Sequence, residues 1–377
     1  MTKYGLKIYA FWAILLFSAG GMKAQLDISV FYEDSPDKIK EKYSAKIFDN
    51  DTVKHGTYTF FFKTGQVYQT GDYRNGKMQG VWKIFYPGGN PKAEYKYRDG
   101  IRNGDFRIFY SGDGLYQKGR YSDDVLHDTL YTYNQDGILS KTEVYRQGIL
   151  HGEYCEYSSE GKIRLKTVYK NGRINGPWEK YYETGEINYK GFKKGDFFRD
   201  SLYVFYKNGQ IQRICYYEDQ VLDGPYKAFY PTGTIHSETI YEGGKPSGLY
   251  EKYFKNGKLA EIGNYKNGKR SGLWKAYYPT GKEKLYGKGE YLQGQYHGMW
   301  IIRHENGELK QKGRYKNGEP EGKWTFYYEN GQAEKTGNFS QGKKQGKWHR
   351  YSRKGELAEV LYYKDDELKE KNQLSDE

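Results

Sequence analysis

Histidines are the residues of this sequence that could hold a metal ion or transfer a proton, and there are seven of them. Four stand at the same place of a repeating pattern, directly before the residue that opens each repeat: His55, His127, His151 and His297. With two strands per repeat, this column spaces its side chains about 10 Å apart, whereas metal ligands lie about 2 Å from one ion. His236, His304 and His349 are isolated, and no His-Glu-x-x-His or Cys-x-x-Cys spacing is present. We therefore expect no metal site and no cofactor.

The sequence patterns of nucleophilic and phosphate chemistry are missing as well. No Gly-x-Ser-x-Gly turn joins a strand to a helix, and no glycine-rich phosphate loop precedes a helix. Paired acids such as Asp123 and Asp124 stand where other repeats have turns, so we interpret them as solvated turn residues. Cys155 and Cys215 are too few for a disulfide framework, and we expect both to be thiols at strand positions. The sequence thus predicts a protein without catalytic residues, not an enzyme.

The basic residues are more regularly organised than the histidines. The formal net charge is +13, and in eight of thirteen repeats Lys or Arg follows one aromatic column: Arg74, Arg98, Arg146, Lys170, Lys193, Lys266, Lys316 and Lys364. In a regular sheet these side chains form a ladder along one edge, which could attract anionic lipid head groups, acidic polysaccharide or nucleic acid. The alternative is that they keep the protein soluble and prevent sheets from stacking.

A period of 24 residues sets the elements that position these side chains. A Gly followed two residues later by an aromatic residue opens most repeats, as at Gly80, and Asp128 and Asp200 take its place twice. Thirteen repeats cover residues 56–367, with a two-residue insertion before Gly298. An aromatic residue also recurs five positions after the opening residue, and a Gly recurs nine positions after it. Another aromatic residue stands seventeen positions after it throughout, if one deletion is placed at Phe192.

Each repeat contains two aromatic-rich runs that end in Asn-Gly or a related pair, which predicts one β-hairpin per repeat. Connections this short place successive hairpins side by side. We therefore expect an all-β fold: an elongated, single-layer antiparallel meander of about thirteen hairpins. The composition agrees, because only 36% of residues are hydrophobic, 18% are aromatic and the mean hydropathy is −1.00. An aliphatic-rich enzyme domain or helical bundle is thereby excluded.

One stretch of 19 residues, from Gly263 to Gly281, shows the pattern most completely: Gly-Asn-Tyr-Lys-Asn-Gly-Lys-Arg-Ser-Gly-Leu-Trp-Lys-Ala-Tyr-Tyr-Pro-Thr-Gly. It closely resembles the MORN repeat in its bacterial variant, and the resemblance covers about 310 of 377 residues. The resemblance implies a hairpin array that acts as an interaction module for proteins or phospholipid head groups. It also implies a relation to the YwqK-type, antitoxin-like members. Asp128, Asp200 and the altered strand at Arg303 depart from the pattern and put the local register in doubt.

The N-terminus has the three parts of a secretory signal peptide. Lys3 and Lys7 precede an apolar run of about ten residues, too short to span a bilayer, and small residues follow. Cleavage is expected after Gly21 or Ala24, and the protein is expected in the periplasm, at the outer membrane or outside the cell. We divide the chain as follows: signal peptide 1–24, N-terminal capping segment 25–55, repeat array 56–367 and charged C-terminal tail 368–377.

From these features we expect a non-catalytic, exported scaffold that binds a protein or a glycan. The expected interaction face carries the aromatic residues two and six positions after the opening Gly: Trp274, Tyr278, Trp324 and Tyr328. One alternative is binding to an anionic membrane surface through the basic ladder, and another is an antitoxin or immunity protein that neutralises a partner toxin. Export argues against a nucleic acid ligand.

Overall fold

The computed structural model describes residues 25–48, 51–112, 114–280 and 285–373, and all their regular elements are β-strands. It contains two compact units, one up to Gly185 and the other from Glu186 onward. The expected signal peptide, residues 1–24, lies outside the described residues. Within the described part of the chain, no helix has the length and apolar character to cross a membrane.

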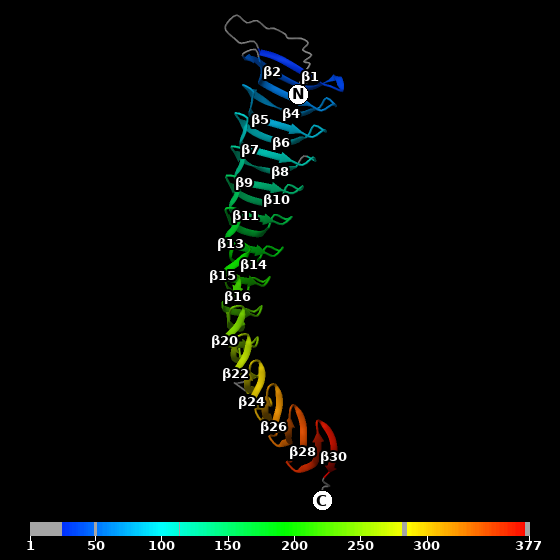
Figure 1. Cartoon of the computed structure of the whole chain (residues 1–377), viewed down its shortest axis with the longest axis vertical. Coiled ribbons are helices and arrows are strands. Elements are labelled where there is room, and N and C mark those ends of the chain that lie inside the picture. The colour runs from blue at the N-terminus through cyan, green and yellow to red at the C-terminus, as the bar shows by residue number, and fades with distance from the viewer. Residues whose placement is uncertain (1–24, 49–50, 113, 281–284, 374–377) are drawn as a thin grey trace, which may run out of the picture. The chain divides into compact units, whose positions relative to one another are not determined.

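Unit 1 is an antiparallel meander in which each strand pairs with the next one in sequence (Figure 1). Its strands are β1 Gln25–Tyr32, β2 Ser35–Phe48, β3 Asp51–Phe61, β4 Val67–Arg74, β5 Lys77–Phe85, β6 Pro91–Arg98, β7 Ile101–Phe109, β8 Leu115–Ser122, β9 Val125–Tyr133, β10 Leu139–Arg146, β11 Ile149–Tyr157, β12 Ile163–Lys170 and β13 Arg173–Tyr181. The expected N-terminal capping segment therefore forms the hairpin β1–β2 and the start of β3.

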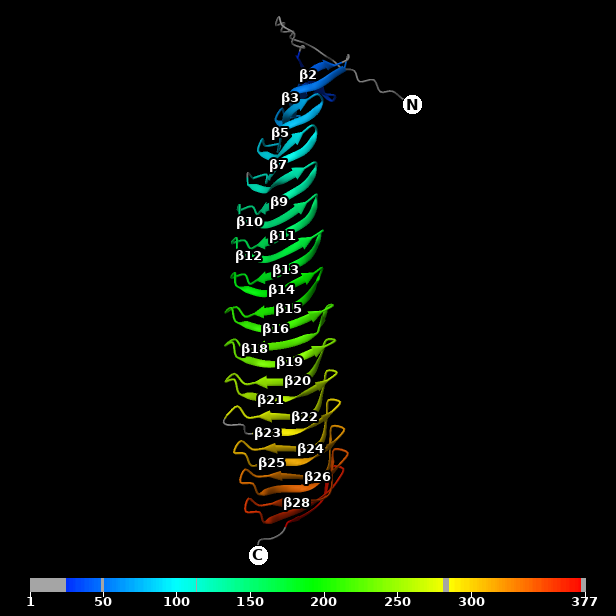
Figure 2. The ribbon, with the colours of Figure 1, turned by 90° about the vertical axis from the view of Figure 1, so that its left-hand side faces the viewer.

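Unit 2 repeats the same arrangement, and Figure 2 shows its hairpins from the side. Its strands are β14 Ile187–Lys194, β15 Phe197–Phe205, β16 Ile211–Glu218, β17 Val221–Leu222, β18 Gly224–Phe229, β19 Ile235–Glu242, β20 Lys245–Tyr253, β21 Leu259–Lys266, β22 Lys269–Tyr277, β23 Leu285–Leu292, β24 Gln295–Arg303, β25 Leu309–Lys316, β26 Glu319–Tyr327, β27 Ala333–Ser340, β28 Lys343–Tyr351, β29 Leu357–Lys364 and β30 Glu367–Gln373. Most of the segment that we expected to be a charged tail is thus a strand, β30. The all-β hairpin meander is confirmed.

Two kinds of connection alternate along each unit. In the first kind two residues join the strands, as at Asn75 and Gly76, whose φ angles of 51° and 78° are those of a type I′ turn. In the second kind five residues form a loop, as between β5 and β6, where Tyr86 N–H donates to the carbonyl of Asn90. We call the two long sides of a unit the turn edge and the loop edge. Because Gly76 N–H donates to Lys54 O, each turn is also bonded to the preceding repeat.

The opening residue of a repeat forms a β-bulge rather than a turn. Between β4 and β5, Thr70 pairs with Lys83 and Asp72 with Gln79, so Gly71 alone faces three residues, 80–82. The opening residue adopts a positive φ in most repeats, for example 69° at Gly80 and 63° at Asp128.

Asp is among the residues that tolerate this left-handed region, and the pairing is unchanged where it replaces Gly. The register that we placed in doubt at Asp128 and Asp200 is therefore regular. At Arg303 the pairing with Leu309 is also the one found at the same place in other repeats.

Candidate interaction surfaces

The aromatic column two positions after the opening residue forms the core of the sheet. For five of the six described tryptophans the bulge tips the ring across the preceding strand, onto a glycine that has no side chain to obstruct it, whereas Trp178 pairs with Thr167. A Cβ built on Gly263 would lie 2.1 Å from the ring of Trp274, and the indole N–H donates to Asn264 O over 3.1 Å. The same arrangement recurs in the pairs Gly71 with Trp82, Gly289 with Trp300, Gly313 with Trp324 and Gly337 with Trp348.

This packing corrects half of the expected interaction face. Trp274 and Trp324 are each only 2% exposed, so their rings are not available to a partner. Tyr278 and Tyr328 are half-buried and lie at the loop edge, where their hydroxyls donate to Arg303 O and Tyr351 O over 2.9 Å.

These two tyrosines belong to a ladder that links neighbouring repeats. Tyr86, Tyr110, Tyr206 and Tyr230 make the same bond to the repeat that follows, and His304 Nε2 takes this place with Tyr327 O, 2.9 Å away. A partner that used these hydroxyls would have to break the bonds between repeats. The role of Tyr278 and Tyr328 in binding stays a prediction.

The tyrosines of the core also differ electrostatically from exposed ones. Burial raises the pKa of Tyr250 to about 12. Burial, with the carboxylates of Glu251 and Glu238 nearby, also raises the pKa of Tyr253 to about 12. Burial and the Glu41 carboxylate raise the pKa of Tyr58 as well. The fold therefore keeps these phenols neutral, as packing side chains rather than as proton donors.

Two of the four histidines of the repeating column contact turns, whereas His127 Nδ1 lies 3.0 Å from Asp128 Oδ1 and the buried His297 Nδ1 has no hydrogen-bond partner among the described residues. His55 Nδ1 lies 3.1 Å from Asn75 Oδ1, and His151 Nδ1 lies 3.3 Å from Asn171 Oδ1, in the turn that begins the next hairpin. In the described part of the chain, no group of three His, Cys, Asp or Glu side chains could hold a metal ion.

Cys155 and Cys215 are free and buried. Burial raises the pKa of both thiols, and Glu153 adds to the effect at Cys155. Because the thiolate is the reactive form, neither side chain is activated as a nucleophile.

The basic ladder lies on the turn edge, with one residue misassigned from the sequence. Arg74, Arg98, Arg146, Lys170, Lys266 and Lys316 are exposed at the last position before a turn. Lys193 is instead half-buried in the aromatic column, with its ammonium 4.7 Å from the centre of the Phe198 ring. Lys194 pairs with Phe197 across the turn, so Lys194 is the ladder residue and no deletion exists at Phe192.

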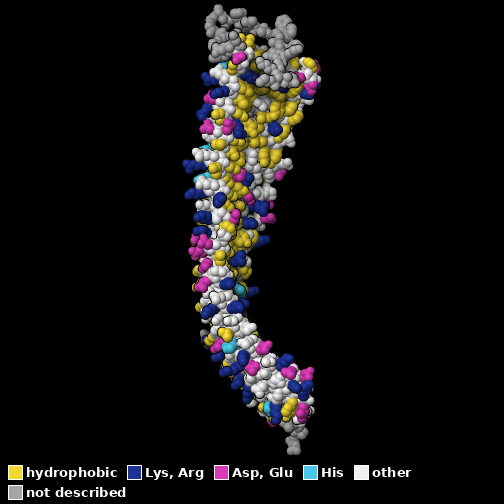
Figure 3. All heavy atoms as spheres, in the orientation of Figure 1, with side chains coloured by type: hydrophobic (Ala, Val, Ile, Leu, Met, Phe, Trp, Pro, Cys, Tyr) yellow, Lys and Arg dark blue, Asp and Glu magenta, His cyan; other side chains and the backbone are white. Residues whose placement is uncertain are grey.

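The ladder is only partly neutralised. Arg98 reaches Asp123, 4.0 Å away, whereas the other exposed members make no ion pair within the described residues. Figure 3 shows Lys and Arg side chains along the turn edge of unit 1, on the left.

Exposed aliphatic side chains form a row on the same edge, which the sequence analysis missed. Ile101, Val125 and Ile149 occupy the first strand position after the turn in three consecutive repeats and are 42%, 42% and 52% exposed. Val125 and Ile149 lie against the turn of the following repeat: a Cβ on Gly148 would lie 3.3 Å from Val125, and a Cβ on Gly172 would lie 3.7 Å from Ile149. We call these three residues the apolar row. A count of this column for uncharged aliphatic residues would have found it.

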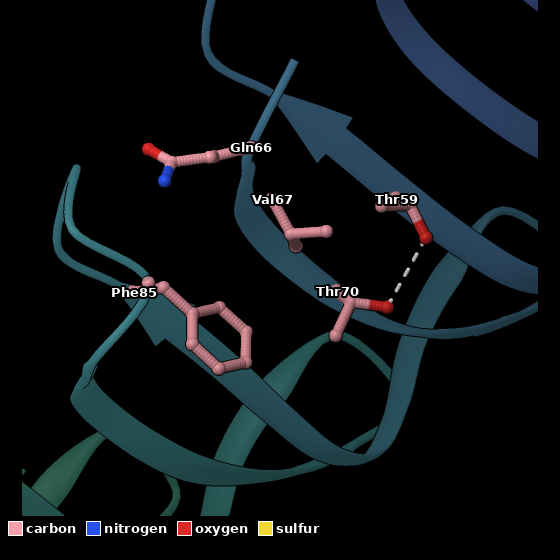
Figure 4. Close-up of a pocket in the computed structure, with 6 residues that line it drawn as sticks. Thr59, Gln66, Val67, Thr70 and Phe85 are labelled. Carbon is pink, nitrogen blue, oxygen red and sulfur yellow. Dashed lines mark hydrogen bonds between the residues drawn. The ribbon is translucent and has the colours of Figure 1, made fainter. Parts of the chain in front are cut away.

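A shallow groove lies nearer the loop edge of unit 1 (Figure 4). Val67 and Phe85 from adjacent repeats form its apolar sides, Thr59 and Thr70 form its polar side, and its volume is about 390 Å³. The two hydroxyls lie 3.2 Å apart and bond to each other. The groove holds no charged side chain, so it offers shape and apolar surface without a catalytic group.

The pattern of the family described as MORN repeat variant matches nine segments that together make up half of the chain: residues 54–75, 78–99, 150–171, 174–192, 202–219, 222–242, 246–267, 296–317 and 320–341. The chain belongs to this family. In this MORN array the recurring Gly residues therefore form bulges and turns, the recurring Trp residues form the core, and the recurring Tyr residues pack in the core or link repeats at the loop edge. The YwqK-type assignment stays a prediction.

The chain is remotely similar to several solved structures. A crystal structure of TcdB2-TccC3 without its hypervariable C-terminal region is 11% identical over 90% of this chain and 19% of that chain, with a TM-score of 0.17. The Tc holotoxin pore of Photorhabdus luminescens is 10% identical over 86% of this chain and 19% of that chain, with a TM-score of 0.15. The chain spans about a fifth of the length of these structures. No curated protein matches it.

Proposed function

We propose that this MORN array is a non-catalytic, exported scaffold that binds a protein partner along the turn edge of unit 1. The apolar row carries the proposal. Three aliphatic side chains that are 42–52% exposed recur at one position of three successive repeats and form a regular row that folding leaves uncovered. The chemistry-bearing residues support a role in binding rather than catalysis, because His55 and His151 bond to turns and both cysteines are buried.

Capture of partners by the immobilised full chain tests this function. Wild type is compared with Ile101→Asp/Val125→Asp/Ile149→Asp by quantitative mass spectrometry of proteins retained from the source cell. We expect at least one saturable partner that the triple variant loses. Leu292→Asp serves as the matched control, because Leu292 is 53% exposed at a turn of unit 2. Identical retained proteins for wild type and triple variant would refute the proposal.

A second candidate is attachment to an anionic membrane surface. The exposed, unneutralised cations Arg74, Arg146 and Lys170 on one edge favour it. Co-sedimentation with vesicles that contain anionic lipid should fall when Arg74, Arg98, Arg146 and Lys170 are changed to Glu, and should fall with rising salt. Co-sedimentation that is unchanged by these substitutions would exclude this candidate.

A further inference from the structure

Two hairpins of unit 1 place like charges directly opposite each other. Arg74 pairs with Lys77 across the Asn75–Gly76 turn, and Lys170 pairs with Arg173 across the next Asn-Gly turn of the same kind. All four side chains are exposed, and none of them forms an ion pair within the described residues. Like charges directly opposite each other destabilise a sheet. We call the two pairs the first clamp and the second clamp.

The two clamps enclose the apolar row. Lys77, Ile101, Val125, Ile149 and Arg173 each begin the strand that follows a turn, in five successive repeats. Two strands per repeat space these side chains about 10 Å apart, and the clamps are eight strands, or roughly 38 Å, apart. In Figure 1 the turns that join these strands lie on one side of unit 1. The edge therefore presents a pair of cations at each end and three apolar residues between them, with Arg98 and Arg146 as single cations opposite Ile101 and Ile149.

We propose that this edge binds an extended acidic segment of a protein, with carboxylates at both ends and an apolar residue at every third position between them. The proposal rests on the scaffold function above and names the partner's chemistry. Charge complementarity selects carboxylates for the clamps, because each clamp adds two unpaired cations.

The spacing of the edge selects the conformation of the ligand. A polyproline II segment has three residues per turn and a rise of about 3.1 Å, so every third side chain returns to one face after about 9 Å. Twelve residues of this conformation cover about 37 Å, which matches the distance between the clamps. In a β-strand, residues three apart point to opposite faces, so a strand running along the edge cannot match every repeat.

The residues between the clamps favour such a ligand over a flat anionic surface. The turns there carry Asp99, Asp123 and Asp124. Asp124 accepts from Arg102 Nε over 2.9 Å, and Asp99 accepts from the Gln79 amide over 2.8 Å. Arg98, which reaches Asp123, and the exposed Arg146 also lie between the clamps, so the charges near these turns are nearly balanced and the excess of positive charge lies at the clamps. A segment with carboxylates at its ends and apolar residues in its middle matches this distribution, whereas a uniform layer of anionic head groups does not.

A synthetic peptide tests the inference. It has two glutamates at each end, leucine at every third position between them and proline elsewhere, fifteen residues in all, and carries a fluorophore. We expect the full chain to bind it with an affinity that falls with salt, and Arg74→Glu/Lys77→Glu to weaken binding at least tenfold. Lys266→Glu/Lys269→Glu is the matched control, because these residues form the same pair across an Asn-Gly turn in unit 2 without an apolar row beside it. The control should change binding less than twofold.

Three results would overturn the inference: no binding of the peptide at millimolar concentration, equal weakening by both double variants, or equal binding of a peptide shortened by six residues. Binding to vesicles of phosphatidylcholine and phosphatidylglycerol is measured in parallel. Binding to the vesicles but not to the peptide would show that the ligand of this edge is a membrane and not an acidic segment. The proposed function and this inference can fail independently. Capture of a partner that depends on the apolar row but not on the clamps would support the scaffold function and exclude the acidic ligand.

Discussion

The contact between glycine and tryptophan is the feature of the core that can be tested most sharply, because one strand provides both the test and its control. In β23 a Cβ on Gly289 would lie 2.1 Å from the ring of Trp300, whereas a Cβ on Gly287, two residues earlier, would meet Ile302 at 3.5 Å. Neither glycine has a positive φ. Gly289→Ala therefore forces the ring to move by more than 1 Å, while Gly287→Ala adds an ordinary van der Waals contact.

The expected energies have opposite signs. Overpacking of this kind costs about 1–3 kcal/mol, so Gly289→Ala should destabilise the repeat by that amount. An alanine in a strand is otherwise more favourable than glycine by about 0.5–1 kcal/mol, so Gly287→Ala should be neutral or stabilising. In a Trp300→Leu background the penalty at Gly289 should fall below about 0.5 kcal/mol, because the obstructing ring is gone.

Hydrogen exchange of the native protein is the appropriate assay, because the repeats of an array open locally. Peptides from β23 and β24 report the free energy of opening in each variant, and peptides from unit 1 serve as the internal reference. Equal opening energies for Gly289→Ala and Gly287→Ala would refute the reasoning. So would a Gly289→Ala penalty that persists in the Trp300→Leu background.

Three further predictions concern the bulge, the loop edge and the pH dependence. Asp128→Ala should destabilise β9 by about 1 kcal/mol or more, because the φ of 63° at this position disfavours Ala, whereas Asp128→Gly should be tolerated. A higher midpoint of thermal unfolding for the Ala variant than for the Gly variant would contradict this. Tyr278→Phe removes the hydrogen bond to Arg303 O and should lower the free energy of unfolding by about 0.5–1.5 kcal/mol, measured by urea unfolding. Tyr116→Phe, at an exposed position, is the control, and equal stabilities of the two variants would count against the hydrogen bonds between repeats at the loop edge. Because folding raises the pKa of Tyr250 and Tyr253 to about 12, their contribution is complete below the unfolded value near 10 and is lost as the pH rises through 12. Unfolding free energy should therefore decline from pH 10 to 12, less steeply in Tyr250→Phe, and an identical slope in that variant would exclude this cause.

Local signals made the hairpins predictable from the sequence. A two-residue type I′ turn requires positive φ angles at both positions, and Asn-Gly pairs such as Asn75 and Gly76 tolerate them. The turns, and hence the hairpin meander, could therefore be predicted from the sequence. The bulge at Gly80 was not predicted, because a glycine in the sequence shows that a positive φ is possible and not where the chain uses it.

The errors in the candidate site come from contacts between repeats. The alternation of residues along β22 shows which side chains lie on the same face as Trp274, but it does not show that the Trp274 ring lies against Gly263 of the preceding strand. Column counting likewise placed a deletion at Phe192 to preserve an aromatic column. In the structure Lys193 fills that column, and Phe198 from the next strand supplies the ring.

Photocrosslinking along the turn edge tests the central claim most directly, namely that the apolar row of this MORN array contacts a protein partner. A photoreactive amino acid replaces Val125 in the apolar row or, as a control, Tyr116, which is 37% exposed near the loop edge. We predict a crosslinked protein of defined mass from position 125 that is absent from position 116. Equal crosslinking from both positions, or none from position 125 in the presence of the source extract, would contradict the account.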